Sequence, residues 1–457
     1  MFRKVQHIHF TGIGGAGMSG IAEILLNMKY YVSGSDNAAS ERTAFLESLG
    51  GKIYRGHDAR FIKGADVLVY SSAISDDNVE IIAAKEKKIP VIARAEMLAE
   101  LMRLKYGIAV AGAHGKTTTT TMIATLLSEG QLDPTAVIGG KVNSFDGHAK
   151  KGEGDFLVAE ADESDGSFLK LSPSIAIVTN LDNEHLDYYQ TFENLCATFL
   201  DFMNKVPFYG LVIFCADDPI LQKMTPQIER RALSYGTSEN AELRAKNIVY
   251  HPGKSSFEVY FQGEPLGHFE LPTPGQHNVL NALAAIAVGI ELDLPATVIR
   301  DGIAAYSGVQ RRFQVQGERE GVLVVDDYAH HPTEILAAID AAKTGWHVPL
   351  LVVFQPHRYT RTRDCFETLA TAFEGVDQLI LTDIYAAGEA PISGITGETF
   401  YKKVCEHRKG QTHFLKNFED IVQKIKKIAQ PDMMLLTLGA GNIWEVGKTF
   451  LADTKQD

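Results

Sequence analysis

The chain has 457 residues, which is too long for one ordinary domain and predicts about three at roughly 150 residues each. A hydrophobic fraction of 45% permits several buried cores, and a formal net charge of −13 argues against binding to nucleic acid or to an anionic membrane surface. No apolar run approaches the roughly 18 residues of a membrane span, and the N-terminus lacks the apolar segment of a signal peptide. The four cysteines are scattered without a C-x-x-C motif. We therefore expect a cytoplasmic protein with reduced thiols.

Strands and helices are predicted to alternate through the first hundred residues. "VQHIHF" at 5–10 predicts a strand, a glycine-rich turn follows, and "SGIAEILLNM" at 19–28 predicts a helix. A further helix is expected at 77–88, and further strands are expected at 30–36, 65–73 and 89–94. Short apolar strands that alternate with amphipathic helices indicate a parallel sheet.

The same pattern restarts twice. The segment "YGIAVAGAHGKTTTTTMIATLL" at 106–127 predicts a strand, a loop and a helix, and further strands follow at 155–162, 174–180 and 211–218. Residues 255–271 alternate with period two around a turn, which predicts a small antiparallel addition. After "SGVQRRFQ", four more strands are predicted at 321–328, 349–356, 378–385 and 432–441.

We therefore predict an α/β protein of three domains, each built on a mostly parallel sheet flanked by helices. The expected boundaries are 1–107 for a Rossmann-like domain, 108–315 for a P-loop domain and 316–457 for a second Rossmann-like domain. No low-complexity linker marks either boundary, and the three parts share no internal sequence repeat.

The first candidate site is the glycine-rich turn "HFTGIGGAGMSG" at 9–20. Gly12, Gly14 and Gly17 fit G-x-G-x-x-G, and Asp36 follows at about the usual distance of ~20 residues. Taken alone, this pattern suggests an NAD-dependent dehydrogenase. Its physical basis is that glycines let backbone N–H groups approach a pyrophosphate, so it indicates a diphosphate and not a nicotinamide.

The second candidate site is "GAHGKTTTT" at 112–120, between an apolar strand and a helix. Lys116 is placed to reach the β- and γ-phosphates of ATP, and the hydroxyl of Thr117 to bind Mg²⁺. The segment departs from the strict phosphate-loop pattern because Val110 stands where the first glycine is required, and the nearest glycine is Gly112. A chance Gly-Lys-Thr is the alternative, which the flanking strand and helix disfavour.

Polar clusters follow the other predicted strands of the second domain. The carboxylates of "VAEADESDGSF" at 158–168 suit a divalent cation at the end of a strand, and a solvated acidic turn is the alternative. His185 in "TNLDNEHLDYY" is either a ligand or a structural hydrogen-bonding residue. His277, Asn278 and Asn281 open an alanine-rich helix, where capping explains one of them and not all three.

Clusters of basic residues mark the third domain. An arginine of "GVQRRF" suits a transferring phosphoryl group, and "DDYAHHPTE" at 326–334 adds two aspartates and two histidines after a strand. "FQPHRYTRTRD" at 354–364 has arginines suited to a carboxylate or a phosphate. Solvated hinge or helix-start residues are the alternative for both basic segments.

Two nucleotide-type loops about 100 residues apart favour a ligase that consumes ATP and holds a nucleotide-linked substrate. A dehydrogenase needs only one of these loops. A regulator that binds nucleotides without catalysis is a third possibility, which the intact Gly-Lys-Thr disfavours.

Eight motifs, in order from "HFTGIGGAGMSGIA" to "FQPHRYTRTRD", resemble the Mur ligase family over essentially the whole chain. These ATP-dependent enzymes build the peptide stem of bacterial cell-wall precursors. The resemblance implies a UDP-substrate domain, a central ATPase and an amino-acid-binding domain, with UDP-N-acetylmuramate and L-alanine as substrates. It also implies ATP with Mg²⁺ or Mn²⁺ as cofactors and a monomer or homodimer. A recycling ligase that attaches a preformed peptide to the same sugar is the alternative, which "FQPHRYTRT" disfavours.

The resemblance implies roles for individual residues. The UDP-substrate site would comprise Gly12, Gly14, Gly15, Gly17, Asp36 and Ser72. The ATP site would comprise Gly112, His114, Gly115, Lys116, Thr117, Thr118, His277, Asn278, Asn281, Arg312 and Asp327, with Arg311 as an alternative to Arg312. The metal would be held by Thr117, Glu160 and His185, and the alanine by Tyr328, His357, Arg358 and Arg361. The catalytic residues would be Lys116, Arg312 and His330, the last as the candidate base for the amine.

Two positions depart from the family pattern. Glu184 stands where many relatives carry Asp, and His148 stands where Asn is usual, in a loop expected near the muramyl substrate. No residue is assigned as the carbamylated lysine that several later Mur ligases use.

Overall fold

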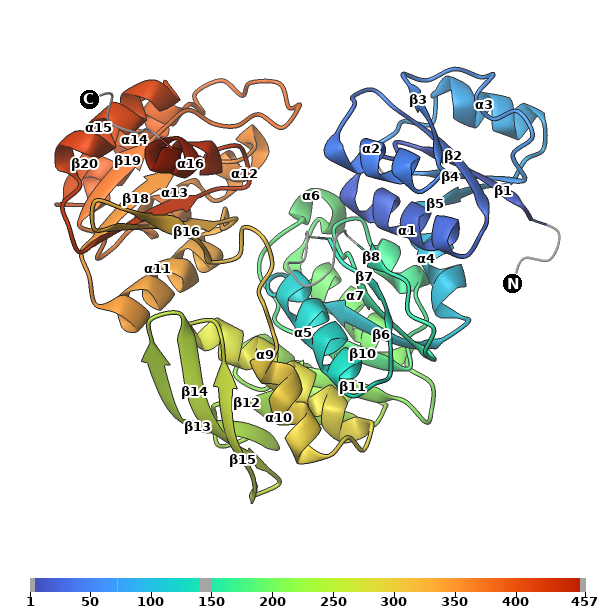
Figure 1. Cartoon of the computed structure of the whole chain (residues 1–457), viewed down its shortest axis with the longest axis horizontal. Coiled ribbons are helices and arrows are strands. Elements are labelled where there is room, and N and C mark those ends of the chain that lie inside the picture. The colour runs from blue at the N-terminus through green and yellow to red at the C-terminus, as the bar shows by residue number, and fades with distance from the viewer. Residues whose placement is uncertain (1–4, 72, 140–148, 453–457) are drawn as a thin grey trace. The chain divides into compact units, whose positions relative to one another are not determined.

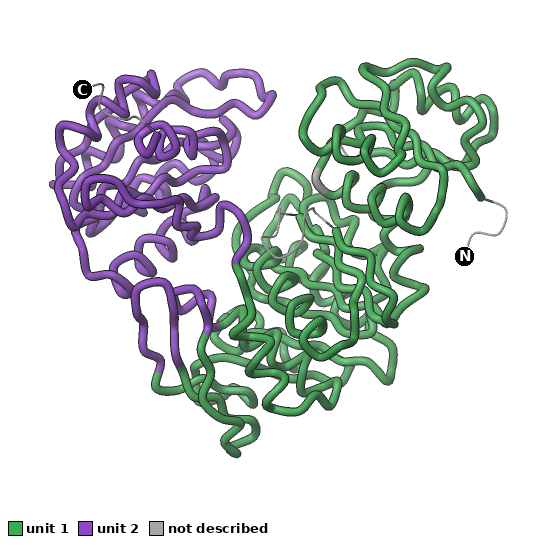
Figure 2. Tube along the Cα trace, viewed as in Figure 1, with its two compact units in different colours: residues 1–247, 257–270, 280–307 green, residues 248–256, 271–279, 308–457 purple. Residues whose placement is uncertain are grey.

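The computed structural model of this chain describes residues 5–71, 73–139 and 149–452 (Figure 1). The described residues form three mostly parallel sheets with helices around them, which confirms the predicted three-part α/β fold. They divide into two compact units, one with residues 1–247, 257–270 and 280–307, the other with residues 248–256, 271–279 and 308–457 (Figure 2). No helix in the described part of the chain combines the length and the apolar character that a bilayer crossing needs.

The first sheet carries the glycine-rich turn. Its elements are β1 (His7–Thr11), α1 (Ala16–Asn27), β2 (Tyr31–Asp36), α2 (Glu41–Ser48), β3 (Lys52–Arg55), β4 (Val67–Tyr70), α3 (Val79–Glu86), β5 (Val91–Ala93) and α4 (Arg94–Met102). The strands are all parallel, in the order β3-β2-β1-β4-β5. The glycine-rich turn follows β1 where the strand order reverses, which is where open sheets of this kind bind ligands. The edge strand β3 was not predicted, because "KIYR" is short and half exposed.

A buried carboxylate joins the two central strands of this sheet. Glu80 lies in the first turn of α3 with no exposed surface. Its Oε2 accepts hydrogen bonds from Thr11 Oγ1 and Ser35 Oγ, both at 2.7 Å, and lies 3.2 Å from His9 Nε2, while Oε1 accepts from Asp58 N at 3.2 Å. Burial alone would raise the pKa of Glu80, but these donors lower it below its ordinary value. Because the glycine-rich turn follows Thr11 directly, Glu80 helps to fix where that turn begins.

The second sheet has ten strands. Its domain contains β6 (Tyr106–Ala111), α5 (Lys116–Glu129), β7 (Thr135–Val137), β8 (Ala149–Lys150), β9 (Phe156–Glu160), η1 (Ser167–Lys170), β10 (Ile175–Val178), α6 (Leu186–Tyr189), α7 (Phe192–Asn204), β11 (Leu211–Cys215), α8 (Pro219–Met224), η2 (Thr225–Gln227), β12 (Ala232–Gly236), β13 (Leu243–His251), β14 (Lys254–Phe261), β15 (Glu264–Leu271), α9 (Gln276–Glu291) and α10 (Ala296–Ala304). The strand order is β15-β14-β13-β12-β11-β10-β6-β9-β7-β8. The predicted antiparallel addition is β14 and β15, and β13 extends it by one strand that was not predicted.

The third sheet has six strands where four were expected. Its elements are β16 (Gln314–Arg319), β17 (Val322–Asp327), α11 (Pro332–Trp346), β18 (Leu350–Phe354), α12 (Tyr359–Asp364), α13 (Phe366–Thr371), β19 (Gln378–Leu381), α14 (Gly397–His407), β20 (Gln411–Phe414), α15 (Phe418–Ile428), β21 (Met433–Leu438) and α16 (Trp444–Ala452). The order is β16-β17-β21-β18-β19-β20, with only β16 antiparallel to its neighbour. The two additional strands are the edges β16 and β20, whose polar sequences give no strand signal.

Both faces of the third sheet are buried, as a parallel sheet requires. Side chains of β18 alternate between two cores: Val352 and Phe354 pack with α11 and α14, while Leu351 and Val353 pack with α15 and α16. This period of two is the reason that the strand has a continuous apolar sequence.

We predict that Glu80→Ala destabilises the first sheet by about 3 kcal/mol, because three buried donors lose their acceptor together. Hydrogen exchange should accelerate in the amides of His7–Thr11 and Tyr31–Asp36. Glu86→Ala, at an exposed position of the same helix, is the matched control and should leave this exchange unchanged. Equal protection of β1 and β2 in the two variants would contradict the role given to Glu80.

Candidate functional site

The glycine-rich turn after β1 is held by backbone contacts with the end of β2. Gly12, at a φ of 81°, and Ile13 both donate to Ser35 O, at 2.9 and 3.1 Å. Gly14 N donates to Asp36 Oδ2 at 2.8 Å, and a Cβ at Gly14 would lie 2.9 Å from that same oxygen. Asp36 therefore shapes the turn directly, in addition to any role toward a nucleotide sugar.

Arg94 connects this turn with the acidic segment of the second sheet. A Cβ at Gly17 would lie 2.7 Å from Arg94 Nη1, so the third glycine of the fingerprint makes room for this guanidinium. Arg94 Nη2 also pairs with Asp162 Oδ2 at 3.0 Å. Sequence analysis did not identify Arg94, because its partner is 68 residues away and it has no local motif.

The phosphate-type loop follows β6 and leads into α5. Gly115 adopts a φ of 85°, and α5 begins without a side-chain cap, so the loop leaves the first N–H groups of the helix to other acceptors. A Cβ at Gly115 would lie 2.5 Å from Asn281 Oδ1, and Thr119 Oγ1 donates to the same oxygen at 3.2 Å. Asn281 of α9 thus packs against the loop.

Lys116 is partly buried at the head of α5. Its Nζ donates to Gly112 O at 2.5 Å, to Ala113 O at 3.1 Å and to Glu163 Oε1 at 2.7 Å. Burial alone would lower the pKa of Lys116, but the Glu163 carboxylate raises it above its ordinary value, so the amine is an ammonium. Glu163, which the sequence grouped with possible cation ligands, is thereby identified as the partner of Lys116.

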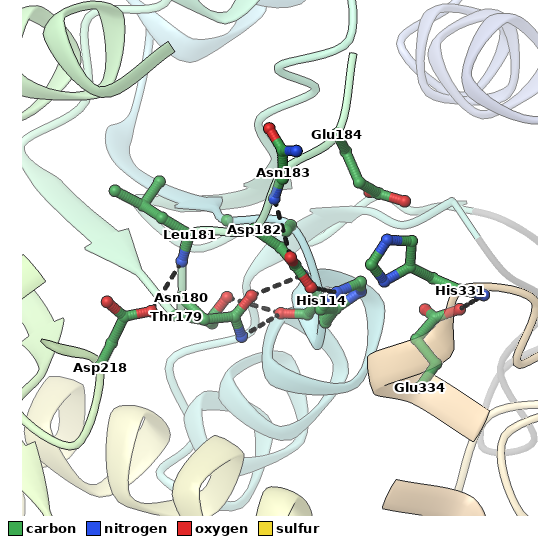
Figure 3. A network of polar contacts seen from close by, with 12 residues as sticks. His114, Thr179, Asn180, Leu181, Asp182, Asn183, Glu184, Asp218, His331 and Glu334 are labelled. Carbon is green, nitrogen blue, oxygen red and sulfur yellow. Dashed lines mark hydrogen bonds and ion pairs between the residues drawn. The ribbon is translucent and has the colours of Figure 1, made fainter. Parts of the chain in front are cut away.

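His114 is fixed by the segment that follows β10 (Figure 3). Its N–H donates to Asn180 Oδ1 at 2.8 Å, and its carbonyl accepts from Thr179 Oγ1 and Asn180 Nδ2. His114 Nε2 lies 2.8 Å from Asp182 Oδ2. Asn180 and Asp182 were not predicted as site residues, although both lie within the quoted motif at 179–189.

The three predicted metal ligands follow neighbouring parallel strands. Thr117 comes after β6, Glu160 ends β9, and His185 comes after β10, on the two sides of β6. Glu160 Oε1 accepts from Gly139 N at 2.6 Å, and His185 Nε2 lies 4.0 Å from Glu163 Oε1. Hydroxyl and carboxylate oxygens suit a hard divalent cation, and Glu163 Oε2 is a further buried carboxylate oxygen with no hydrogen-bond partner among the described residues. These donors are of the chemical type that a hard divalent cation binds, and their common role as ligands stays a prediction.

The head of α9 carries the other two polar residues predicted there. Asn278 Nδ2 donates to Thr273 Oγ1 at 3.2 Å and to Pro274 O at 2.7 Å, so this amide organises the chain before the helix. His277 is half-buried, and its partial burial together with the charge of Arg312 lowers its pKa to about 4. It is therefore a neutral imidazole at pH 7.

The two adjacent arginines differ in their contacts. Arg311 donates from Nε to Asp326 Oδ2 at 3.0 Å, from Nη1 to Gly441 O at 2.9 Å and from Nη2 to Gly439 O at 2.5 Å. Its guanidinium is thus committed to holding β17 next to the loop after β21. Arg312 forms an ion pair with Glu334, with 3.5 Å between Nη1 and Oε1, and its guanidinium lies 5.4 Å from the centre of the Tyr328 ring. The role of Arg312 toward ATP stays a prediction.

Asp327 and His330 lie at the end of β17. Asp327 accepts from Phe313 N and Ala329 N, both at 2.7 Å, and burial raises its pKa to about 6. His330 Nδ1 lies 2.9 Å from Tyr328 O and 3.3 Å from Glu334 Oε2, and both of these are acceptors. The proton of the neutral ring is therefore on Nδ1, which makes Nε2 the basic nitrogen.

The segment after β18 brings the remaining predicted residues together. The His357 ring stacks on Tyr385 with 5.7 Å between centroids, and Arg361 Nη1 lies 3.5 Å from His357 Nδ1. Arg358 N donates to Tyr385 O at 2.8 Å, and Glu389 accepts from Thr360 N and Oγ1. Burial and the neighbouring cations lower the pKa of His357 to about 3, so the arginines and not this histidine carry the positive charge. Tyr385 and Glu389 were not predicted.

Two positions named from the sequence, Ser72 and His148, lie outside the described residues. Thr118, Gly15 and the other loop residues predicted for the two nucleotide sites belong to the two strand–loop–helix turns described above.

Comparisons with known proteins agree with this arrangement. The chain matches models described as "Mur ligase family, catalytic domain" at residues 7–106, "Mur ligase middle domain" at 110–289 and "Mur ligase, glutamate ligase domain" at 311–441. It is 54% identical to a UDP-N-acetylmuramate–L-alanine ligase of Geobacter sp. (strain M21), over 100% of this chain and 99% of that one, and 52% identical to its namesake from Geobacter sulfurreducens, over the same shares.

Solved structures show the same similarity. The structure of a UDP-N-acetylmuramate–alanine ligase from Thermotoga maritima matches with a TM-score of 0.83 and 28% identity, over 98% of each chain. A murein peptide ligase from Psychrobacter arcticus matches with a TM-score of 0.69 and 23% identity, again over 98% of each chain, and at that identity it shows the fold alone.

We predict that His357 makes the second unit less stable as pH falls. The unfolded chain binds a proton at this position near pH 6.5, but the folded chain binds it only near pH 3, so the unfolded state binds more protons between these values. His357→Gln should reduce the slope of stability against pH in this window, by at most about 1.4 kcal/mol per pH unit. Both tryptophans, Trp346 and Trp444, belong to this unit, so denaturant unfolding followed by their fluorescence measures it.

His407→Gln, at an exposed position of α14, serves as the control for that measurement. It should retain the slope of the parent protein. A His357→Gln variant whose slope equals that of the parent would show that the buried imidazole is protonated as easily as a free one.

Proposed function

The chain belongs to the Mur ligase family, and we infer that it is an ATP-dependent ligase that joins L-alanine to UDP-N-acetylmuramate in peptidoglycan synthesis. The observation that carries this inference is the 54% identity over the whole chain to a relative of that name. The presence of a phosphate-type loop at Lys116, separate from the glycine-rich turn, supports it. The dehydrogenase suggested by the glycine-rich turn alone is replaced by this function.

We propose that each of the three expected domains binds a different substrate. Residues 1–107 would hold the UDP-linked sugar with the turn at Gly12, Gly14, Gly15 and Gly17, residues 108–315 would bind ATP, and residues 316–457 would bind alanine. Because ATP and UDP-linked sugars are intracellular metabolites, we propose that the enzyme works in the cytoplasm.

The reaction must convert a carboxylate, which has a poor leaving group, into an amide. We propose that the lactyl carboxylate attacks the γ-phosphorus of ATP, so that the bond to the β–γ bridging oxygen breaks and ADP leaves. The product is an acyl phosphate. The amine of alanine then attacks the acyl carbon, the C–O bond to phosphate breaks, and the amide and inorganic phosphate are released.

Both steps gather negative charge on phosphate oxygens, and cationic groups stabilise such charge most in a water-poor site. Lys116, with its ammonium partly buried at the head of α5, is suited to the β- and γ-phosphates. Arg312 is suited to the transferring group, because it stands at the position that the resemblance to Mur ligases assigns to the arginine near the γ-phosphate. A divalent cation held by Thr117, Glu160 and His185 would supply further charge neutralisation.

The amine must lose a proton before or as it attacks. We propose that His330 accepts this proton at Nε2, since its Nδ1 hydrogen is directed to Tyr328 O. Arg358 and Arg361 are suited to the carboxylate of alanine, and the neutral His357 ring would orient Arg361 through their 3.5 Å contact.

We propose that the adenosine part of ATP lies near the head of α9, where Asn278 and Asn281 contact different neighbours. We also propose that Asp327 holds the ribose. The support for Asn281 is its direct packing against Gly115 and Thr119 of the phosphate-type loop.

The purified protein, given UDP-N-acetylmuramate, ATP and Mg²⁺ with a panel of amino acids, should release phosphate and form the alanyl product, identified by mass. With hydroxylamine in place of the amino acid, the acyl phosphate should be trapped as a hydroxamate. Product formation only with a preformed peptide would instead assign the recycling activity, and failure to trap a hydroxamate would argue against the acyl phosphate.

Lys116→Ala should reduce kcat by at least about a hundredfold, since a partly buried cation aimed at the transferring phosphoryl group contributes several kcal/mol. The affinity for UDP-N-acetylmuramate should remain within about twofold, because that substrate binds the separate turn after β1. Steady-state phosphate release measures kcat, and calorimetric titration measures the affinities for UDP-N-acetylmuramate and for ATP. Comparable losses of affinity for both ligands would contradict two separate sites.

A further inference from the structure

The ammonium of Lys116 has all of its hydrogen-bond donors committed to the protein. A lysine ammonium has three donors, and Lys116 directs them to two carbonyls of its own loop and to Glu163 Oε1. A phosphate that binds this loop must therefore replace at least one of these acceptors. The carboxylate is the strongest competitor among them, because it is the only one of the three acceptors that ionises.

Glu163 is held where it can compete. Its backbone carbonyl accepts from Gly166 N at 3.1 Å and from Tyr189 Oη at 2.5 Å, which fixes the chain at this point. Its side chain is 3% exposed, and Oε2 has no hydrogen-bond partner among the described residues. A buried carboxylate with one oxygen unsatisfied depends on the ammonium for most of its stabilisation.

We propose that Glu163 is a positioning residue that competes with nucleotide phosphates for Lys116: it holds the ammonium in the loop between turnovers, and nucleotide binding breaks this pair. The inference rests on the proposed function only in assigning the loop to ATP. Its consequence is that part of the phosphate-binding free energy is used to separate Lys116 from Glu163. The pair re-forms as ADP leaves, so Glu163 weakens the binding of the product and favours its release.

The competition predicts that a conservative substitution of Glu163 raises nucleotide affinity, whereas most substitutions in a binding site lower it. Glu163→Gln keeps the shape of the side chain and an oxygen that can accept from Lys116, but it removes the competing charge. Nucleotide affinity should therefore increase. Damage to the loop, or loss of a group that merely supports it, would decrease affinity instead.

The experiment is a calorimetric titration of the full-length protein with ADP, at fixed ionic strength and with a chelator in place of Mg²⁺. The chelator removes any contribution that Glu163 makes through a cation. We expect the Kd of Glu163→Gln for ADP to fall about tenfold relative to the parent, which is the scale of one charge-assisted hydrogen bond. Stopped-flow displacement should show a slower release of ADP.

Asp165→Asn is the matched control, because it removes one negative charge from the same acidic turn. Asp165 Oδ1 accepts from Ser167 N at 3.0 Å, a bond that an asparagine oxygen can keep. The Kd of Asp165→Asn for ADP should stay within about twofold of that of the parent, since salt screens the effect of a charge that makes no direct contact with Lys116.

An unchanged or higher Kd in Glu163→Gln overturns the proposal, and so does an equal decrease in Asp165→Asn, because the effect would then be one of general charge. If Glu163→Gln does not fold, Glu163→Asp replaces it: the shorter carboxylate reaches Lys116 poorly, so the Kd for ADP should again fall, and an unchanged value overturns the proposal. These titrations contain no UDP-N-acetylmuramate or alanine, so a protein that binds ADP but forms no alanyl product would refute the proposed function and leave this result standing.

Discussion

Parallel pairing of β9, β6 and β10 is the constraint on which the candidate ATP site depends. Parallel strands direct their carboxyl ends to one edge of a sheet, so the loops that follow them meet there. The Lys116 loop comes from the middle strand, the acidic turn with Glu163 from one neighbour and the segment with His185 from the other. Residues up to about seventy positions apart are thereby placed within hydrogen-bonding distance without any long loop of their own.

The charges at this edge are paired, and pairing lowers the cost of those that are removed from solvent, above all the buried carboxylate of Glu163. Lys116 pairs with Glu163, and Arg94 pairs with Asp162 while it packs against Gly17. Glu163 therefore contacts the phosphate-type loop, and its neighbour Asp162 contacts Arg94 at the start of α4. Because Arg94 also lies against Gly17, the acidic turn is linked to the glycine-rich turn through this arginine.

The third sheet uses its buried charges in another way. Arg311 pairs with Asp326 of β17 and donates to two carbonyls of the loop after β21. One position further, Arg312 pairs with Glu334, and Asp327 accepts from two backbone N–H groups. Adjacent residues of the chain thus contact different parts of the third domain. After β18, the neutral ring of His357 contacts Arg361, so the arginines of this segment carry the positive charge.

The sequence by itself determined the α/β class, the central strands, the two strand–loop–helix turns and the resemblance to Mur ligases, because each depends on local periodicity or on residues close together in the chain. It did not reveal the polar edge strands β3, β16 and β20, whose pairing partners and not their own composition make them strands. Only the tertiary structure decided that Lys116 meets Glu163, that Arg94 fills the space at Gly17, and that Arg311 joins β17 to the loop after β21. The physical reason is that these contacts join residues tens to more than a hundred positions apart, and the side-chain directions that make them are set by packing and not by local sequence.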